Sequence, residues 1–419
     1  MYFFTILEKR QVKVMLLFEV KKVLTKPLNK AALLILAAVF VIACVLTIRY
    51  VDYTDQDGNT VTGISAAHGL REMKNQWAGD VTEDVIREAV RQNAAINASD
   101  EALSEDIQEQ NKAYGKKQGF EDIREMLNMS FSGIKQYDYY TADNLTEDEA
   151  AGLYEQRLQS LKDYLDSGQV DFTENEKEYL LQNYGEFETP VHYEYAEGWM
   201  ALMDSAYFIT LMMILVLILG FLVSGIFSDE FAWKADAIFF SSRTGRGRAI
   251  LAKMGAGLLI ITVLYWGVVL LFAGVVLAAL GAGGGDCPVQ IWNWYSIYNI
   301  TYFQDYLLSA VGGYIGALFI LILSMLASAR THSTVFAITI PFALTCVAPF
   351  LGRVDTFSKP LRLFPDQLLQ ICANLRDFEL YEIGGKVLRQ VDVLIPMYLI
   401  LAVAIFPLLY VVYRRSQVK

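Results

Sequence analysis

Six apolar stretches, each close to the length that crosses a lipid bilayer, constrain this chain more than any other feature. A transmembrane helix needs about 20 predominantly apolar residues. The stretches cover residues 31–48, 206–227, 249–280, 306–329, 335–351 and 393–413. The first, second and fourth contain no charged residue, and 54% of the 419 residues are hydrophobic. The sequence therefore predicts an all-α, polytopic membrane protein with six transmembrane helices.

The fifth stretch, 335–351, gives the weakest of these signals because it is short and contains Pro341 and Pro349. Proline is tolerated in a membrane helix where a neighbouring group satisfies the carbonyl that it leaves without a donor. We therefore expect this stretch to be a broken span.

The orientation follows from basic residues close to the span ends. They precede the first stretch and follow the second and the sixth: Lys9, Arg10, Lys13, Lys21, Lys22, Lys26, Lys30, Lys234, Arg243, Arg246, Arg248, Arg414, Arg415 and Lys419. Six spans place all of them on one side, although six further bases between Arg353 and Gln390 then lie outside. Five spans would move the C-terminal arginines outside. We predict a multi-pass plasma-membrane protein with both termini cytoplasmic.

Outside the spans, the prediction assigns 1–30 to a cytoplasmic interfacial helix and 414–419 to a cytoplasmic tail. Residues 281–305 form an external loop, and 352–392 form an external loop or re-entrant helices. The basic leader is too long for a signal peptide, so the first span is expected to be an uncleaved anchor. Translation from Met1 or from Met15 remains open.

Residues 49–205 are predicted to form an acidic extracytoplasmic domain. Between Val51 and Ser205 there are 33 acids and 12 bases, a net charge of −21, whereas the rest of the chain carries +10. Such a charge would repel nucleic acid. Capping-box sequences at Thr146–Glu149 and Thr173–Glu176 predict helices that end at Gly168 and Gly185. Weaker periodicity predicts helices over 82–98 and 120–129. The domain is expected to be α-helical.

The sequence offers little for catalysis or cofactor binding. No phosphate-binding loop of the form G-x-x-x-x-G-K-[ST] is present. The segment Gly384-Gly385-Lys386-Val387 lacks the leading glycine and the final hydroxyl of that motif. His68, His192 and His332 are isolated, and His332 is expected in a solvated turn. We predict no enzyme activity, no cofactor and no metal. Cys287 and Cys372 both fall in external loops, so a disulfide between them remains open.

The spans also offer no predicted ion pathway, because Asp305 and Asp392 fall at span ends and Lys253 near an interface. Any driving energy for transport would then come from outside the chain.

The connection between the second and third spans, residues 228–248, is the most informative segment. It is expected to form a short amphipathic helix with Phe231, Ala235, Ile238 and Phe239 on one face, followed by a basic turn. Physical argument alone leaves two interpretations open. The helix rests among lipid headgroups, or it docks a partner.

This connection resembles the coupling segment of type-2 ABC (ATP-binding cassette) transporter permeases. The matching residues are Glu230, Phe239, Ser241, Ser242, Gly245, Arg246 and Lys253. Residues 18–27 are similar to the family's N-terminal interfacial helix, and six spans with a large insertion after the first match a bacterial exporter branch. The chain departs from the family at Lys234-Ala235-Asp236, where Gly-Thr is common. The acidic domain carries no matching motif.

The resemblance implies a permease subunit of an exporter, worked by a separate cytoplasmic ABC ATPase that binds the ATP. It also implies a second permease copy, in a homodimer or a heterodimer, within the lipid bilayer. The coupling residues would be Glu230, Phe231, Phe239, Ser242, Arg246 and Lys253. The external charge of −21 would attract a cationic or antimicrobial peptide as substrate. The alternative is a membrane-anchored sensor or scaffold whose acidic domain binds a ligand without transport.

Overall fold

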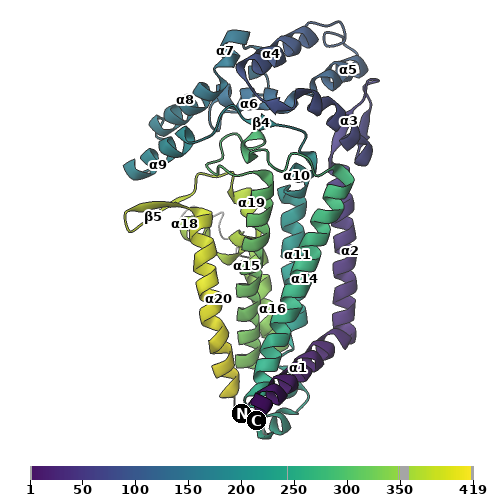
Figure 1. Cartoon of the computed structure of the whole chain (residues 1–419), viewed down its shortest axis with the longest axis vertical. Helices are drawn as coiled ribbons and strands as arrows, with labels where there is room; N and C mark the ends of the chain where they lie inside the picture. The colour runs from purple at the N-terminus through teal and green to yellow at the C-terminus, as the bar shows by residue number, and fades with distance from the viewer. Residues whose placement is uncertain (1, 243, 348, 350–357, 417–419) are drawn as a thin grey trace.

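Long helices form a bundle beneath a smaller domain, and the chain is mostly helical (Figure 1). The computed structural model describes residues 2–242, 244–347, 349 and 358–416. We call the end of the bundle below the acidic domain its domain end and the opposite end its basal end. The domain is built from the segment between the helices α2 (Pro27–Tyr50) and α10 (Glu197–Leu202).

Within the described part of the chain, five helices are long and apolar enough to cross a membrane. Four of them are α2 (Pro27–Tyr50), α14 (Arg248–Leu280), α15 (Tyr302–Thr331) and α20 (Gln390–Arg414), and the fifth joins α10 (Glu197–Leu202) to α11 (Ser205–Ser224). They indicate a multi-pass membrane protein. Several of these helices begin a few residues before the corresponding apolar stretch of the sequence. Pro27 suits the first turn of α2, and a capping box of Thr301 and Gln304 starts α15.

The predicted fifth span forms a shorter apolar helix. Residues Thr334–Phe342 form α16, and Ala343–Val347 continue it as the π-helical segment η4. Pro341 has no N–H to donate to the carbonyl of Ala337. The Ser324 hydroxyl of α15 donates to that carbonyl instead, at 2.7 Å. The neighbouring helix therefore satisfies the proline break. Residues 348, 350 and 351 of the predicted span lie outside the described part of the chain.

The acidic domain confirms the two predicted capping boxes and the helices near them. Its helices are α3 (Ile64–Lys74), η1 (Asn75–Trp77), α4 (Glu83–Asn97), α5 (Ile107–Lys117), α6 (Glu121–Ser132), η2 (Thr141–Asp143), α7 (Glu147–Ala151), α8 (Leu153–Asp166) and α9 (Glu174–Gly185). The single helix expected after Thr146 is interrupted at Gly152, between α7 and α8. Two antiparallel pairs, β1 (Asp52–Thr54) with β2 (Thr60–Thr62) and β3 (Gly79–Asp80) with β4 (His192–Tyr193), were not predicted.

The segments predicted as external loops contain short ordered elements. The α14–α15 connection holds η3 (Val289–Ile291). After residue 357 come α18 (Ser358–Leu361), η6 (Pro365–Leu369), α19 (Ile371–Asn374), β5 (Leu380–Ile383) and β6 (Lys386–Arg389). Gly384 and Gly385, both at positive φ, form the turn of the β5–β6 hairpin. Cys287 and Cys372 are both buried free thiols, so the disulfide considered above is not formed.

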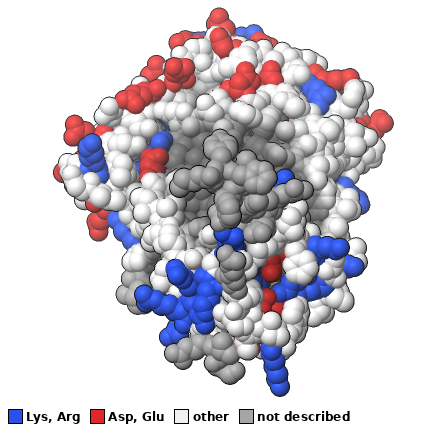
Figure 2. All heavy atoms as spheres, turned by 60° about the horizontal axis from the view of Figure 1, so that its bottom comes forward, with Lys and Arg blue, Asp and Glu red and all other residues white. Residues whose placement is uncertain are grey.

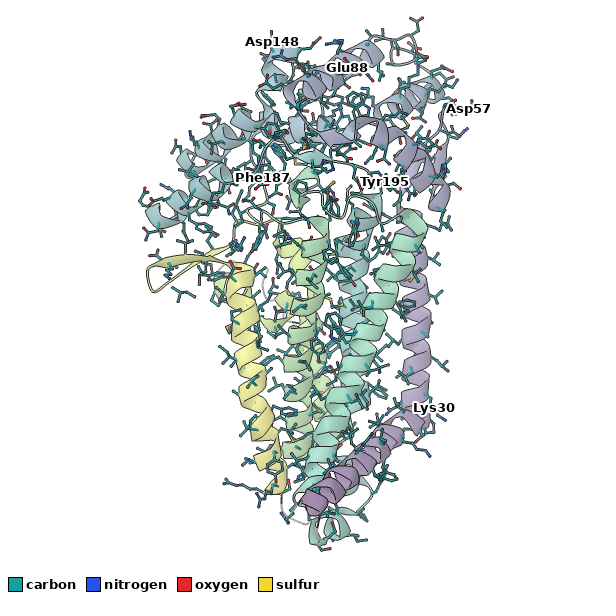
Figure 3. All side chains as sticks on the ribbon, viewed as in Figure 1. Lys30, Asp57, Glu88, Asp148, Phe187 and Tyr195 are labelled. Atoms are coloured by element: carbon teal, nitrogen blue, oxygen red, sulfur yellow. The ribbon has the colours of Figure 1, made fainter. Side chains whose placement is uncertain are left out.

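Two arginines, one of them buried, connect the acidic domain to the bundle. Arg157 of α8 donates from Nε to the Trp294 carbonyl at 2.9 Å and from Nη2 to the Ser296 carbonyl at 3.3 Å. Its guanidinium lies 4.0 Å from the Tyr184 ring centroid and 4.4 Å from that of Phe187. Figure 3 shows Phe187 close to the junction of domain and bundle. A second arginine, Arg71 of α3, donates to the Leu280 carbonyl at the end of α14.

We expect Arg157→Ala to reduce the free energy of unfolding by about 3 kcal/mol, because it leaves the Trp294 carbonyl without its donor and a cavity among aromatic rings. Thermal unfolding in detergent measures this loss. Arg87→Ala, which removes a surface pair with Asp148, is the control and should cause a much smaller loss. Equal losses in the two variants would contradict the assigned role of Arg157.

Candidate functional site

The connection between α11 and α14 lies at the basal end and consists of two short helices, not the single amphipathic helix expected. They are α12 (Asp229–Ala232) and α13 (Asp236–Ser241). The break falls at Lys234, whose φ of 56° is left-handed and cannot continue a right-handed helix. The break rotates α13 relative to the expected face. Ile238 is therefore 75% exposed, and Phe240 is buried in its place.

A group of six charged side chains holds this connection against its neighbours. We call Glu19, Lys22, Lys26, Asp229, Glu230 and Lys253 the basal charge cluster. Lys253 of α14 is fully buried, although the sequence placed it near an interface. Its ammonium lies 2.7 Å from Glu230 Oε1 and 3.3 Å from Glu19 Oε2, and it donates to the Ile226 carbonyl at 2.8 Å. Three acceptors therefore surround the buried ammonium.

The helix α1 (Tyr2–Thr25) and the residue that follows it contribute two further cations to the basal charge cluster. Lys22 Nζ lies 2.7 Å from Glu230 Oε1, and Lys26, just after α1, pairs with Asp229. The cluster thus contains three lysines and three carboxylates, so its formal charges cancel. Glu230 accepts from both Lys22 and Lys253, which links α1 to α14 through α12.

Neighbouring charges favour the ionised forms of Glu230 and Lys22. Burial raises the pKa of Glu230, but the charges of Lys253 and Lys22 outweigh burial and hold this pKa below its ordinary value of 4.5. Burial lowers the pKa of Lys22, and Glu230 outweighs it and raises that pKa. The stabilisation from Glu230 is therefore present above pH 4.5 and is lost as the pH falls through the lowered pKa.

Aromatic rings cover the basal charge cluster and join it to the ends of α15 and α20. The buried Tyr413 of α20 donates its hydroxyl to Glu230 Oε2 at 3.4 Å and lies 4.8 Å from the Phe227 ring. Phe231 stacks on His332 with ring centroids 3.6 Å apart. His332, which follows α15, is therefore a half-buried stacking residue and not the solvated turn residue expected from the sequence.

The predicted coupling residues do not all lie together. Glu230 and Lys253 belong to the basal charge cluster, and Phe231 and Phe239 lie within 6.4 Å of the Tyr413 ring. The Arg246 guanidinium donates to the Arg414 carbonyl at 2.7 Å, which ties the basic turn to the end of α20. Ser242 is exposed and donates only to the nearby Phe239 carbonyl. The prediction missed Glu19, Lys22, Lys26, Asp229 and Tyr413.

The outer surface of the connection is apolar and lies among basic side chains. Ile238 and Trp233 are 75% and 58% exposed. Figure 2, which brings the basal end forward, shows blue Lys and Arg side chains gathered there and red acids along the far rim. The connection is thus joined to α1 and α14 through the basal charge cluster, and to α20 through Arg246 and Tyr413.

A second candidate site is a cavity of about 410 Å³ between the acidic domain and the bundle. Its walls combine carboxylates with aromatic and apolar side chains: Tyr50, Val51, Asp52, Leu70, Lys74, Tyr114, Gln118, Glu121, Asp122, Glu125, Met129, Glu197, Met200, Ala201 and Trp292. Five of these are acids and one is a base. The Lys74 ammonium pairs with Asp122 at 2.8 Å and with Glu197. The lining therefore carries a net negative charge.

Burial shapes the ionisation of this cavity. It raises the pKa of Glu121, which accepts from the Tyr114 hydroxyl at 2.9 Å. Burial lowers the pKa of Lys74, but Asp122 and Glu197 outweigh it and raise that pKa well above its ordinary value. A cation entering the cavity would be favoured by the unbalanced carboxylates. Among the described residues, no group of three His, Cys, Asp or Glu is placed to hold a metal ion.

Two charged side chains near helix ends are buried. Lys253 lies in the second turn of α14, and Asp305 lies in the first turn of α15, at the helix end expected from the sequence. Asp305 is 7% exposed and accepts from Ser309 Oγ. Comparison with known proteins adds no assignment for these sites: the chain matches no protein family, no curated protein and no solved structure.

We expect Lys253→Met to reduce the free energy of unfolding by about 3 to 5 kcal/mol, because Glu230 and Glu19 then keep buried charge without this partner. Thermal or denaturant unfolding in detergent measures the loss. Adding Glu230→Gln to Lys253→Met should recover part of it.

The matched control is the exposed pair of Lys177 and Glu174 on α9, 2.8 Å apart. Lys177→Met should leave the unfolding midpoint nearly unchanged. A similar midpoint for Lys253→Met and Lys177→Met would show that the buried ammonium does not organise the basal end.

Proposed function

We propose that this chain is the membrane-spanning permease subunit of an ABC exporter, driven by ATP that a separate ATPase subunit hydrolyses. The observation that carries the proposal is the basal charge cluster, which joins the α12–α13 connection to α1 and α14. In this proposal the chain crosses the plasma membrane six times, with α16 and η4 as a short, broken fifth span. The termini and the connection face the cytoplasm, and the acidic domain faces outward.

The geometry of the connection supports a mechanical role. An ATPase that closes on ATP can drive a permease only if it favours one arrangement of the helices over another. The connection offers the required contact, because Glu230 is bonded to Lys22 of α1 and to Lys253 of α14. Movement of α12 therefore cannot leave α1 and α14 in place without breaking buried ion pairs.

The exposed surface of α13 supports docking of a protein partner. Interfaces between proteins are enriched in aromatic residues, and tryptophan often carries much of the binding energy. Ile238 of α13 is 75% exposed, and Trp233, between α12 and α13, is 58% exposed with the Lys22 ammonium 4.8 Å from its ring centroid. The basic residues around them suit a partner with acidic side chains. A second permease copy, with its own ATPase, would complete the transporter.

The acidic domain supports a cationic substrate, a peptide in our proposal. Its net charge would concentrate cations near the membrane surface by long-range attraction. The cavity beneath the domain has carboxylates and aromatic walls, which suit an amphipathic cation.

We expect Ile238→Asp to reduce the permease-stimulated ATP turnover of the cognate ATPase about tenfold, because it places a charge in the docking surface. The measurement is ATP hydrolysis by the purified complex in nanodiscs. Leu103→Asp, at a 73% exposed position of the acidic domain, is the matched control and should retain full turnover. Full turnover with Ile238→Asp would contradict docking at α13.

The cavity also favours the second candidate function, a sensor that binds a cationic ligand without transport. Such a protein needs an external binding site but no ATPase. Stimulated ATP turnover distinguishes the two functions, because a sensor would bind its ligand and leave ATP hydrolysis unaffected.

In both functions we expect the tripeptide Lys-Trp-Lys to bind in this cavity, and Glu121→Gln to weaken binding about tenfold, or about 1.4 kcal/mol. Calorimetry on the full chain in nanodiscs measures this. Because the pKa of Glu121 is raised, binding to the native chain should weaken as the pH falls toward that pKa. Asp57→Asn, at an exposed acid that does not line the cavity, should bind normally. Equal affinity in all three proteins would exclude the cavity as the site.

A further inference from the structure

The helix α1 presents two different faces. Glu19 and Lys22 point inward to the basal charge cluster, and Val23 is buried beside them. The opposite face carries Lys13, Val14, Leu17, Phe18 and Lys21, which are all exposed, and we call these five residues the outer stripe. The three apolar members are 62%, 52% and 65% exposed, in chain order.

The outer stripe follows from helical spacing. Lys13, Leu17 and Lys21 are each four residues apart, so they lie in one row along the helix, and Val14 and Phe18 form the neighbouring row. Glu19 is the only acid between Val12 and Lys30, and it faces inward. The exposed face of this segment therefore carries apolar side chains, and the charged side chains on it are all basic.

The lysines of the outer stripe have no acidic partner within the described residues. Lys22 and Lys26, by contrast, are both paired with carboxylates. Lys30, in the first turn of α2, is also exposed and has no acidic partner there, and Figure 3 shows it beside the junction of α1 and α2. Three unpaired ammonium groups thus lie along one side of the basal end.

The position of α1 fits the surface of a bilayer. Figure 1 shows α1 running obliquely across the basal end, directly before α2 enters the bundle. A helix in a membrane interface buries apolar side chains at the boundary of the acyl chains, and its lysines reach the headgroups. Each lysine near an anionic leaflet contributes attraction that salt screens.

We propose that the outer stripe and Lys30 bind the headgroups of anionic phospholipids, with Val14, Leu17 and Phe18 inserted between the lipids. This inference goes beyond the proposed transport function, because it depends only on insertion of the chain in a membrane. The position of α1 favours a lipid surface for these apolar side chains over an acidic protein, because α1 leads directly into α2, which is long and apolar enough to cross a membrane. Anionic lipid would then bind the exposed face of α1, while the basal charge cluster binds its inward face.

The test compares how the full chain, reconstituted in phosphatidylcholine bilayers, selects between trace spin-labelled phosphatidylglycerol and spin-labelled phosphatidylcholine. Electron spin resonance measures the fraction of each that the protein immobilises. We expect the native chain to prefer phosphatidylglycerol about threefold at low salt, and the preference to fall to near unity at 1 M salt. A preference that persists at 1 M salt, or its absence at low salt, would overturn the proposal without any variant.

Variants then locate the site. The triple substitution Lys13→Gln, Lys21→Gln and Lys30→Gln should abolish the preference, and the corresponding triple substitution by arginine should retain it. The control removes three exposed lysines from the domain end, Lys162→Gln, Lys359→Gln and Lys386→Gln, and should leave the preference unchanged. An unchanged preference in the first triple variant, or an equal loss in the control, would contradict the assignment. If the first variant keeps its lipid preference but loses association with the ATPase, the basic face serves a protein partner instead.

Discussion

A buried ammonium cannot remain charged inside a protein without carboxylates close to it, and this constraint organises the basal end. Lys253 lies on α14, its partners Glu230 and Glu19 lie on α12 and α1, and no water-exposed alternative is open to a fully buried side chain. The three elements must therefore stay in contact. The short connection after α11 becomes a rigid part of the bundle and not a loose loop.

The domain end is held in a comparable way by arginine. Arg157 and Arg71 donate to carbonyls in and before the α14–α15 connection, so the acidic domain is attached to the end of α14, the helix that the basal charge cluster links to α1 at the other end. A rearrangement at one end therefore reaches the other through α14. In the proposed transporter, this shared attachment would couple ligand binding at the acidic domain to movement at the basal end.

The sequence predicted the elements that depend on local signals. Apolar length located five long helices, and the capping boxes at Thr146 and Thr173 located α7 and α9. The break at Lys234 was missed, because a left-handed conformation is uncommon for any residue other than glycine and lysine gives no local signal for it. Lys22 was missed as a partner of Glu230, because 208 residues separate them and spacing on one helix cannot show which distant acid it meets.

The sidedness of the connection tests the central claim most directly. Replacing Ile238 by Cys in one protein and Leu103 by Cys in another places a thiol at each exposed position, and a membrane-impermeant maleimide is applied to intact and to permeabilised cells. The native protein, in which three of four cysteines are buried, gives the background. We expect Leu103→Cys to react in intact cells and Ile238→Cys to react only after permeabilisation. Reaction of Ile238→Cys in intact cells would place the connection outside and contradict the account.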